Sequence, residues 1–408
     1  MSTETGVSPV NLEKISRGSE TEKTDKSLTG IHIEKTSYNN ILLLGATGFL
    51  GIHILDYLLN LTNSGIFCIV RGETLIRAKD RLRKLLSYYF PGRYADMPEN
   101  RVFVLKGDIT EKNFGLSDNK HQHIVKNIDA VIHTAALVKY YADYSEFERV
   151  NVSGTRNITE FAFANNLPLF YVSTMGLATH YLTAQKQNFT FLENDLYNSE
   201  AYEHNLYIKS KYEAEKLINQ FITQGLQAAV FRVGNLTGRY SDGHFQINIQ
   251  ENHFYNVLRT ILSIGAVSGN VLDTEFDLTP VDLCSKAIVE TAFTKDCLGR
   301  NFHIYNHNTI SVDRLLNLLD SVNIHIKSLK KDEFQALIRE LSMKGSVNLG
   351  GIANDLDDEY QLDFGGSVNV DSRFSVGYLK KLGFYWPVID EEYIQKLIKY
   401  MKTVKFIV

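Results

Sequence analysis

The chain has 408 residues, of which 44% are hydrophobic and 22% charged, and its formal net charge is −4 at pH 7. At roughly 100–200 residues per domain, this length allows about two to four domains. The composition is typical of globular proteins and excludes disordered, collagen-like and heptad-repeat chains. The slightly acidic balance argues against broad binding to nucleic acid or to an anionic membrane.

Three cysteines, Cys68, Cys284 and Cys297, lie far apart in the sequence. An odd number without paired spacing predicts neither a disulfide framework nor a zinc site, and it fits a reducing compartment. No basic segment leads into an apolar one at the N-terminus, and no stretch approaches the roughly 18 apolar residues of a membrane span. We therefore expect a cytoplasmic protein with no bound metal and no membrane partner.

The first half of the chain alternates short apolar runs with segments of helical length. Residues 1–37 precede this pattern and are rich in Ser, Thr, Glu and Lys, so we expect a flexible linker or tail there. The apolar runs are Ile41–Leu44, Ile66–Val70, Val102–Leu105, Ala130–Ile132, Leu169–Val172 and Ala228–Val233. Helical segments between them include Glu73–Tyr89, Ser153–Ala164 and Lys209–Thr223. Continuous apolar strands that alternate with helices predict a doubly wound α/β fold, with a parallel sheet covered on both faces.

A glycine-rich turn follows the first predicted strand and opens the first predicted helix. Its sequence is Gly45-Ala46-Thr47-Gly48-Phe49-Leu50-Gly51. Glycines at this spacing permit a tight turn, a close approach of the backbone to a pyrophosphate, and close packing of helix on strand. The positive end of the helix dipole then faces the phosphates. In this context the motif predicts a Rossmann-like dinucleotide-binding domain rather than a simple tight turn.

The end of the second predicted strand indicates which dinucleotide binds. Arg71 stands 20 residues after Gly51, where an NAD-specific fold places an acidic residue against the ribose hydroxyls. An arginine there suits a 2′-phosphate, so we expect NADPH, with Arg77 and Arg81 of the next helix as further candidates. The alternative for these side chains is a solvated basic helix face. Asp108, just past the third strand, is a candidate adenine contact or equally a helix cap.

Two Tyr-x-x-x-Lys pairs compete as a catalytic dyad. In this pattern a phenol and an ammonium lie one helical turn apart, so the cation stabilises the phenolate and also reaches a ribose. The pairs are Tyr207/Lys211 and Tyr212/Lys216. Spacing alone does not choose between them, but Tyr207 lies nearer the carboxyl edge of the sheet, where ligands bind. The third member would be Ser173 or Thr174, directly after the fifth strand, where an N-cap is the alternative.

Several further segments carry a resemblance to a known family. They are Val131–Ala136, Asn151–Thr155, Val172–Thr174, Tyr207–Lys211, Thr279–Asp282 and, most specific, Arg232–Arg239 followed by Asp242–Gln246 and Asn248. With the glycine-rich turn, they resemble the extended short-chain dehydrogenase/reductases, and within them the terminal thioester reductase domains of nonribosomal peptide synthetases. The run from Arg232 is similar to the reductase domains of low-GC bacterial synthetases, such as the aureusimine type that makes dipeptide aldehydes.

This resemblance implies a reaction, a cofactor and a partner. The reaction is NADPH-dependent reductive release, as an aldehyde, of an acyl or peptidyl thioester tethered to the phosphopantetheine of a peptidyl carrier protein. The implied catalytic residues are Thr174, Tyr207 and Lys211. The implied cofactor contacts are Gly45, Thr47, Gly48, Phe49, Leu50, Gly51, Arg71, Arg81, Asp108, Ala135 and Lys211.

The sequence shows no carrier motif of its own. A carrier domain has Gly-Gly-x-Ser around its pantetheine serine, whereas Gly365-Gly366-Ser367 lacks the intervening residue. We therefore expect the substrate arm to come from another domain or chain. Lys396, Lys399 and Lys402 stand at helical spacing as a candidate landing site for an acidic carrier helix, although a solvated helix face explains them equally well.

Helical patterns predominate in the last 160 or so residues, where the alternation with strands is lost. They lie at Phe254–Ile264, Val281–Phe293, Val312–Leu319, Lys331–Leu341 and Glu391–Lys402. We expect residues 38–245 to form the NADPH-binding domain, with a returning segment near 276–305. Residues 246–275 and 306–408 would form a smaller, mostly helical domain that faces substrate and carrier. Two alternative functions stay open: a reductase or epimerase of free small molecules, and a catalytically silent dinucleotide sensor.

Overall fold

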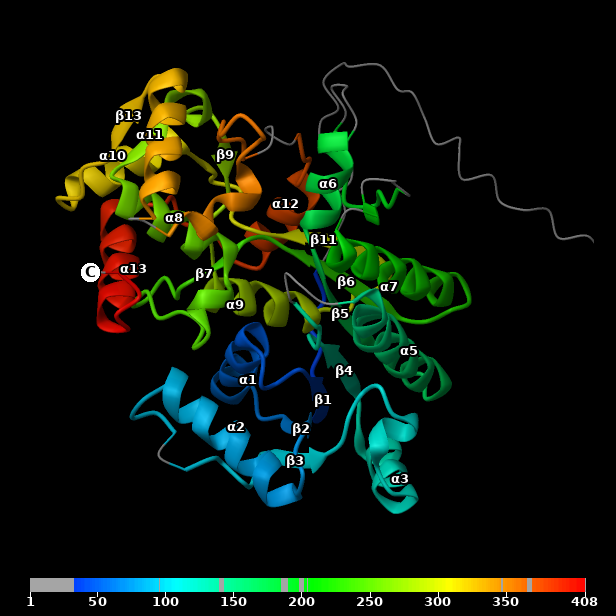
Figure 1. The fold of residues 1–408 in the computed structure, drawn as a ribbon. Coiled ribbons are helices and arrows are strands. Elements are labelled where there is room, and N and C mark those ends of the chain that lie inside the picture. Colours follow the sequence, from blue (N-terminus) through cyan, green and yellow to red (C-terminus); the bar gives the residue numbers. More distant parts are fainter. Residues whose placement is uncertain are drawn as a thin grey trace, which may run out of the picture.

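The computed structural model describes residues 33–94, 96–138, 143–184, 190–197, 202–203, 205–345, 348–364 and 369–407. Its centre is a seven-stranded sheet of order β11-β6-β5-β4-β1-β2-β3, in which every neighbouring pair is parallel (Figure 1). The strands are β1 Asn40–Leu44, β2 Gly65–Val70, β3 Val102–Lys106, β4 Ala130–His133, β5 Leu169–Thr174, β6 Ala228–Val233 and β11 Arg300–Ile304. The predicted doubly wound α/β fold is therefore confirmed.

Helices cover both faces of this sheet, and the side chains of β1 show why. Ile41 and Leu43 point into one apolar cluster and Leu42 and Leu44 into the other, and all four are fully buried. The first cluster is closed by α1 Phe49–Leu61, α2 Leu75–Tyr89 and α9 Val281–Ala292. The second is closed by α3 Asp118–Asn127, α5 Gly154–Ala164 and α7 Leu206–Thr223. Two shorter helices are α4 Tyr144–Phe147 and α6 Gly176–Ala184.

Two helices begin where a polar side chain caps them rather than where the apolar pattern starts. Thr74 accepts a hydrogen bond from the Arg77 amide at 3.2 Å, so α2 begins at Leu75 and not at Glu73. Asn205 accepts one from the Ile208 amide at 3.1 Å, so α7 begins at Leu206, three residues before the predicted start.

A smaller lobe, rich in helices, stands beyond the carboxyl ends of the strands (Figure 1). Its helices are α8 His253–Ile264, α10 Val312–Ser321, α11 Lys331–Lys344 and α13 Glu391–Thr403. Its strand pairs are β8 Ala266–Ser268 with β13 Lys327–Leu329, and β9 Glu275–Phe276 with β12 Ile310–Ser311. A third pair, β7 Leu236–Thr237 with β10 Thr279–Pro280, lies where the chain passes between the lobes. Single turns lie at η1 Lys112–Gly115, η4 Ile249–Glu251, η5 Gly269–Val271, η6 Leu349–Gly351 and η7 Ala353–Asp355.

The last part of the chain contacts both lobes. Helix α12, Arg373–Lys381, packs on β11, and the ring of its Tyr378 meets Phe302 at 5.1 Å between centroids. Helix α13 instead buries Ile394 and Leu397 in the smaller lobe. At the other end, Lys35 forms an antiparallel bridge with Thr294, and residues 1–32 of the predicted tail lie outside the described residues. The domain boundaries given above stay predictions.

Two further findings concern the whole described chain. Cys68, Cys284 and Cys297 are all free and buried. No helix among the described residues is both long and apolar enough to cross a membrane.

Candidate active site

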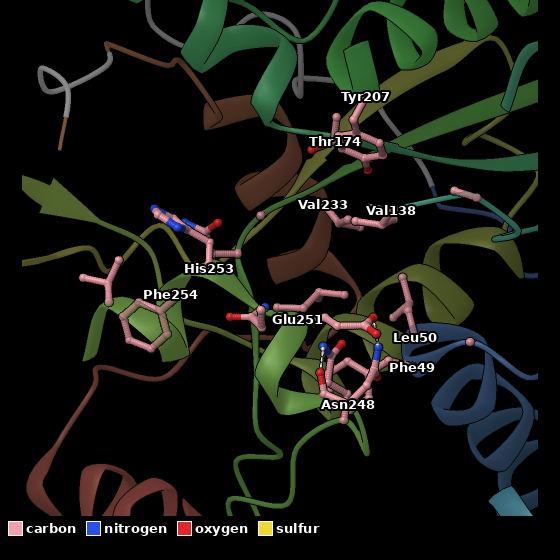
Figure 2. A pocket seen from close by; sticks show the side chains of 18 of the residues that line it. Phe49, Leu50, Val138, Thr174, Tyr207, Val233, Asn248, Glu251, His253 and Phe254 are labelled. Carbon is pink, nitrogen blue, oxygen red and sulfur yellow. Dashed lines mark hydrogen bonds between the residues drawn. The ribbon is translucent and has the colours of Figure 1, made fainter. Parts of the chain in front are cut away.

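A cavity of about 1100 Å³ opens at the carboxyl edge of the sheet, between the sheet and the smaller lobe. The order of the strands reverses between β1 and β4, which is where ligands bind in doubly wound folds. Figure 2 shows Thr174 and Tyr207 together on one side of this cavity, and His253 and Phe254 of α8 on another. Phe49 and Leu50, at the start of α1, line a third side.

The glycine-rich turn is shaped for close contact with a ligand. Gly45 has φ of +91°, and a Cβ there would lie 2.4 Å from Thr134 Oγ1. A Cβ at Gly51 would lie 2.0 Å from the Gly45 carbonyl oxygen. The Gly48 amide donates to Gly45 O at 2.8 Å, which closes the turn and aims the first turn of α1 at the cavity. This cradle fits the pyrophosphate of a dinucleotide.

Most of the predicted cofactor residues line the cavity. They are Thr47, Gly48, Phe49, Leu50, Gly51, Arg71, Arg81 and Lys211. Gly45 and Ala135 are not among the lining residues; they pack beneath the turn, where Gly45 meets the Ala135 backbone. Asp108 also lies outside the lining. Its Oδ1 accepts from the Thr110 amide at 2.9 Å, so the side chain closes a local turn, close to the capping alternative.

Three cations face the cavity at its cofactor end. Arg71 follows β2 and is exposed, and Arg81 lies on α2. Burial, and the neighbouring charge of Arg71, lower the pKa of Arg81. Lys84 joins them one turn further along α2, a residue that sequence reasoning missed although its spacing from Arg81 was visible. Arg77 does not line the cavity.

Thr174 and Tyr207 form the reactive end of the site. Thr174 is the last residue of β5, and its Oγ1 accepts from the Gly176 amide at 3.1 Å. Burial raises the pKa of Tyr207 to about 12, and a hydrogen bond from Thr174 opposes that rise. Tyr207 is therefore a protonated phenol at neutral pH, ready to donate a proton.

Lys211 lies one turn below Tyr207 and is almost fully buried. Its Nζ donates to the Val172 carbonyl at 2.7 Å and sits 4.3 Å from the centroid of the Tyr171 ring. Burial lowers the pKa of Lys211 to about 7, and the negative charge of Glu215 opposes this effect. The ammonium of Lys211 therefore loses its proton as the pH rises through about 7.

The competing dyad is not at the cavity. Tyr212 packs against Tyr202 at 5.2 Å between ring centroids, and Lys216 is exposed. Neither belongs to the cavity lining, whereas Tyr207, Lys211 and Thr174 all do.

A buried ion pair supports the site from below, and sequence reasoning missed its role. Arg232 and Glu215 have fully buried side chains, and Arg232 Nε donates to Glu215 Oε1 at 3.0 Å. Ser173 Oγ donates to Glu215 Oε2 at 2.7 Å. Ser173, the other candidate for the third member of the triad, is therefore held by Glu215, while Thr174 lines the cavity together with Tyr207.

Asn151 is a second residue whose role the sequence motif did not indicate. It lies in a π-helical turn, η2 Glu148–Ser153, a rare element that is frequent at functional sites. Its Nδ2 donates to Ser210 Oγ at 2.9 Å, and its Oδ1 accepts from the Leu137 amide at 2.7 Å. Asn151 thereby ties helix α7 to the loop after β4, which lines the cavity.

The smaller lobe supplies the opposite wall. Helix α8 presents Val257, Leu258 and Ile261, and helix α10 presents Val312, Leu315, Leu316 and Leu319. Each set repeats at helical spacing, so one apolar stripe from each helix faces the cavity. These stripes were visible in the sequence as amphipathic helices, but the pattern did not show that they line the same cavity.

The candidate carrier-landing lysines differ from one another. Lys396 pairs with Glu392 at 2.8 Å and donates to the Tyr240 carbonyl at 3.2 Å. Lys399 and Lys402 are exposed, and neither forms an ion pair within the described residues. Gly365-Gly366-Ser367 lies outside the described residues.

Comparisons with known proteins place this arrangement in a family. An NAD-binding family model described as male sterility protein matches residues 43–288. A linear gramicidin synthase from Brevibacillus parabrevis is 27% identical over 374 residues, which is 90% of this chain but 7% of that protein. The chain thus spans a small part of the length of this curated relative.

Solved reductase domains share the fold over almost the whole chain. A thiolation-reductase di-domain from an archaeal nonribosomal peptide synthetase is 31% identical, with a TM-score of 0.78 over 92% of this chain and 77% of that one. The reductase domain of the aureusimine biosynthetic cluster is 25% identical, with a TM-score of 0.75 over 91% of this chain and 92% of that one. The cradle fits the nicotinamide dinucleotide that such a family binds. The chain therefore belongs to the male sterility protein family of NAD-binding oxidoreductases, as a reductase domain of the type found in nonribosomal peptide synthetases.

Proposed function

We propose that this protein uses NADPH to release a carrier-tethered acyl or peptidyl thioester as an aldehyde. One observation carries the proposal: Thr174, Tyr207 and Lys211 line the same cavity as the glycine cradle and the apolar faces of α8 and α10. A thioester carbonyl bound by Thr174, Tyr207 and Lys211 would thus lie between the cofactor site and a wall that accommodates the acyl chain. When bound, the nicotinamide ring would supply the hydride.

Side chains of this protein would stabilise the negative charge that develops on the carbonyl oxygen. Tyr207 and Thr174 donate hydrogen bonds where negative charge develops as hydride adds to carbon, and preorganised donors contribute most at that point. Tyr207, which is protonated at neutral pH, then gives its proton to the oxygen. Lys211, charged below a pKa of about 7, lowers the cost of the phenolate that remains.

Collapse of the resulting hemithioacetal completes the reaction. The carbon–sulfur bond breaks, the thiol of the pantetheine arm leaves with a proton, and the oxygen re-forms a carbonyl as an aldehyde. The carbon gains two electrons and one hydrogen as hydride, and the oxygen gains one proton from Tyr207. That proton leaves the hemithioacetal hydroxyl for the departing sulfur, and a proton from solvent restores Tyr207. A thiol is a far better leaving group than an alkoxide, so no further residue is required to expel it.

The choice of NADPH rests on Arg71, Arg81 and Lys84. These three cations lie together at the cofactor end of the cavity, and none of them forms an ion pair within the described residues. A ribose 2′-phosphate placed there would gain charge-assisted hydrogen bonds, whereas the neutral hydroxyls of NADH would leave the cations without an anion.

Product analysis tests the proposal. The purified protein is incubated with NADPH and hexanoyl pantetheine, and released thiol, oxidised cofactor and trapped aldehyde are measured together. We expect one NADPH consumed per thiol, with hexanal as the product. Two NADPH per thiol with hexanol would replace the aldehyde by an alcohol as the product. Absence of thiol release, with turnover of a free aldehyde or ketone instead, would return the protein to the reductases of free small molecules.

A further inference from the structure

Charge is divided unevenly across the cavity. Among the described residues, the lysine and arginine side chains of its lining, Arg71, Arg81, Lys84 and Lys211, all come from the first 211 residues. The carboxylates of the described lining come from the smaller lobe and the segment leading to it: Glu251, Glu275 and Asp355. The described lining residues after Lys211 include no lysine or arginine. The substrate side of the cavity is therefore electronegative.

Glu251 and Glu275 have no positively charged partner among the described residues. Glu251 Oε2 accepts from Asn248 Nδ2 at 2.5 Å, and Glu275 Oε2 accepts from Thr309 Oγ1 at 2.6 Å. Neither contact brings a positive charge, and among the described residues neither carboxylate pairs with a lysine or arginine. Both residues are exposed and line the cavity.

Asp355 is the most enclosed of the three. Its side chain is 13% exposed, and its Oδ1 lies 3.1 Å from His253 Nε2. Its other oxygen, Oδ2, is buried and has no hydrogen-bond partner among the described residues. A carboxylate oxygen that is removed from water and left without a donor is costly, so Asp355 has a hydrogen-bonding capacity that the described residues do not fill.

Helices of the smaller lobe add apolar side chains to the cavity lining. The stripes of α8 and α10, together with Phe276, line the cavity, and Leu258, Val312 and Leu319 are buried. An extended hydrocarbon chain would bury apolar surface along these stripes.

We propose that the substrate chain combines an apolar body with a cationic amine, and that Asp355, with Glu275, binds this amine. The inference rests on the thioester reductase function proposed above and adds a substrate class to it. The same carboxylates repel a chain that ends in a carboxylate, because an anion brought among them loses its hydration and gains only like charges. The cavity thus selects aminoacyl or amine-bearing peptidyl thioesters and rejects dicarboxylic ones.

Matched thioesters test this selectivity. Pantetheine thioesters of octanoate, of 8-aminooctanoate and of suberate share one chain and differ only in a terminal methyl, ammonium or carboxylate group. The six-carbon set, hexanoyl, 6-aminohexanoyl and adipoyl, guards against a mismatch in length. We expect kcat/KM with the aminoacyl chain to exceed that with the dicarboxylic chain by at least about tenfold at one length or both.

Variants of Asp355 identify the group responsible. Asp355→Asn should bring the ratio of kcat/KM for aminoacyl over unsubstituted chains toward one, and Asp355→Lys should favour the suberoyl chain. Glu275→Gln, at an exposed residue, should lower the same ratio less and guards against misfolding of the Asp355 variants. Glu359→Gln, an exposed carboxylate outside the cavity lining, is the matched control and should leave the ratio unchanged.

The outcomes separate this inference from the proposed function. Reduction of octanoyl and hexanoyl pantetheine without preference for the aminoacyl chains would overturn the cation site and leave the reductase function intact. A preference that survives both Asp355 variants would equally overturn the role of Asp355. No reduction of any thioester by the unmodified protein would reject the function and this inference together.

Discussion

The two walls of the cavity are built in different ways. The cofactor wall consists of strand ends and the turns that follow them, with Gly51 and Thr174 locked by backbone packing and hydrogen bonds. The substrate wall consists of helix faces, α8 and α10, that present aliphatic side chains, and the carboxylates of Glu251, Glu275 and Asp355 belong to the same lining. Strand ends in a packed sheet hold reacting groups in fixed geometry, whereas side chains on helix faces change without disturbing the fold. The first wall is suited to common chemistry and the second to selecting a substrate.

Removal of the proton donor Tyr207 should have the largest effect on activity, and it should act on the chemistry at the first wall. Tyr207→Phe is expected to lower kcat by about 10²–10⁴-fold, because only the donor to the developing oxyanion is lost. Binding of NADPH, measured by fluorescence titration, should change little. Tyr212→Phe is the matched control, since Tyr212 lies on the same helix but outside the cavity, and it should retain most of the activity. The reverse ranking would show that the reactive end is wrongly placed.

Removal of Arg71 should affect the cofactor wall alone. Loss of a charge-assisted contact to the 2′-phosphate costs about 1.5–3 kcal/mol, so Arg71→Ala should reduce kcat/KM for NADPH roughly tenfold to a hundredfold. The value for NADH should change much less, so the preference between the cofactors narrows. Arg77→Ala is the control, because Arg77 is exposed and outside the cavity lining. Equal use of both cofactors by the unmodified protein would contradict the role of Arg71.

The pH dependence should report the buried lysine. Burial lowers the pKa of Lys211 to about 7, so the ammonium is present below that pH and is lost above it. If the charged form supports catalysis, kcat/KM should fall as pH rises through about 7. Glu215→Gln removes the charge that raises this pKa, so the midpoint should move to lower pH. A midpoint unaffected by Glu215→Gln would show that another group controls the profile.

Glu215 also has a structural role, which requires a control. Its removal leaves Arg232 buried without a partner, and breaking a buried pair costs about 3–5 kcal/mol. Thermal unfolding should therefore accompany each pH profile, and the profile should be read only where the variant is folded. Glu213→Gln, on the same helix and bonded to Tyr144, should leave the midpoint unchanged.

The sequence predicted these two walls unequally, for a physical reason. Gly45 and Thr174 follow apolar strands directly, and all strands of a parallel sheet end at one edge, so local patterns were enough to bring them together. Asp355 lies in a single helical turn far from α8 in sequence, and only tertiary packing places it beside His253. Arg71 and Arg81 both line the cavity, because the end of β2 and the following helix α2 are neighbours in the fold. Asp108 follows the third strand in the same way, but it lies outside the cavity lining, where its side chain accepts from the Thr110 amide.

The smallest expected effect concerns the surface that meets a carrier. Lys399 and Lys402 are exposed on α13, whereas Lys396 is already bound to Glu392 and to the Tyr240 carbonyl. If an acidic carrier helix docks on this face, charge reversal of Lys399 and Lys402 should raise KM several-fold for a carrier-bound thioester and spare the same acyl group on pantetheine. The effect should diminish as salt screens the contact.

Charge reversal at Lys344, an exposed lysine on α11 that pairs with Glu340, is the control. Equal responses of both substrates would remove α13 from the docking surface. Equal kcat/KM on carrier and mimic in the unmodified protein would go further, because remote contacts with a carrier would then contribute no binding energy at all.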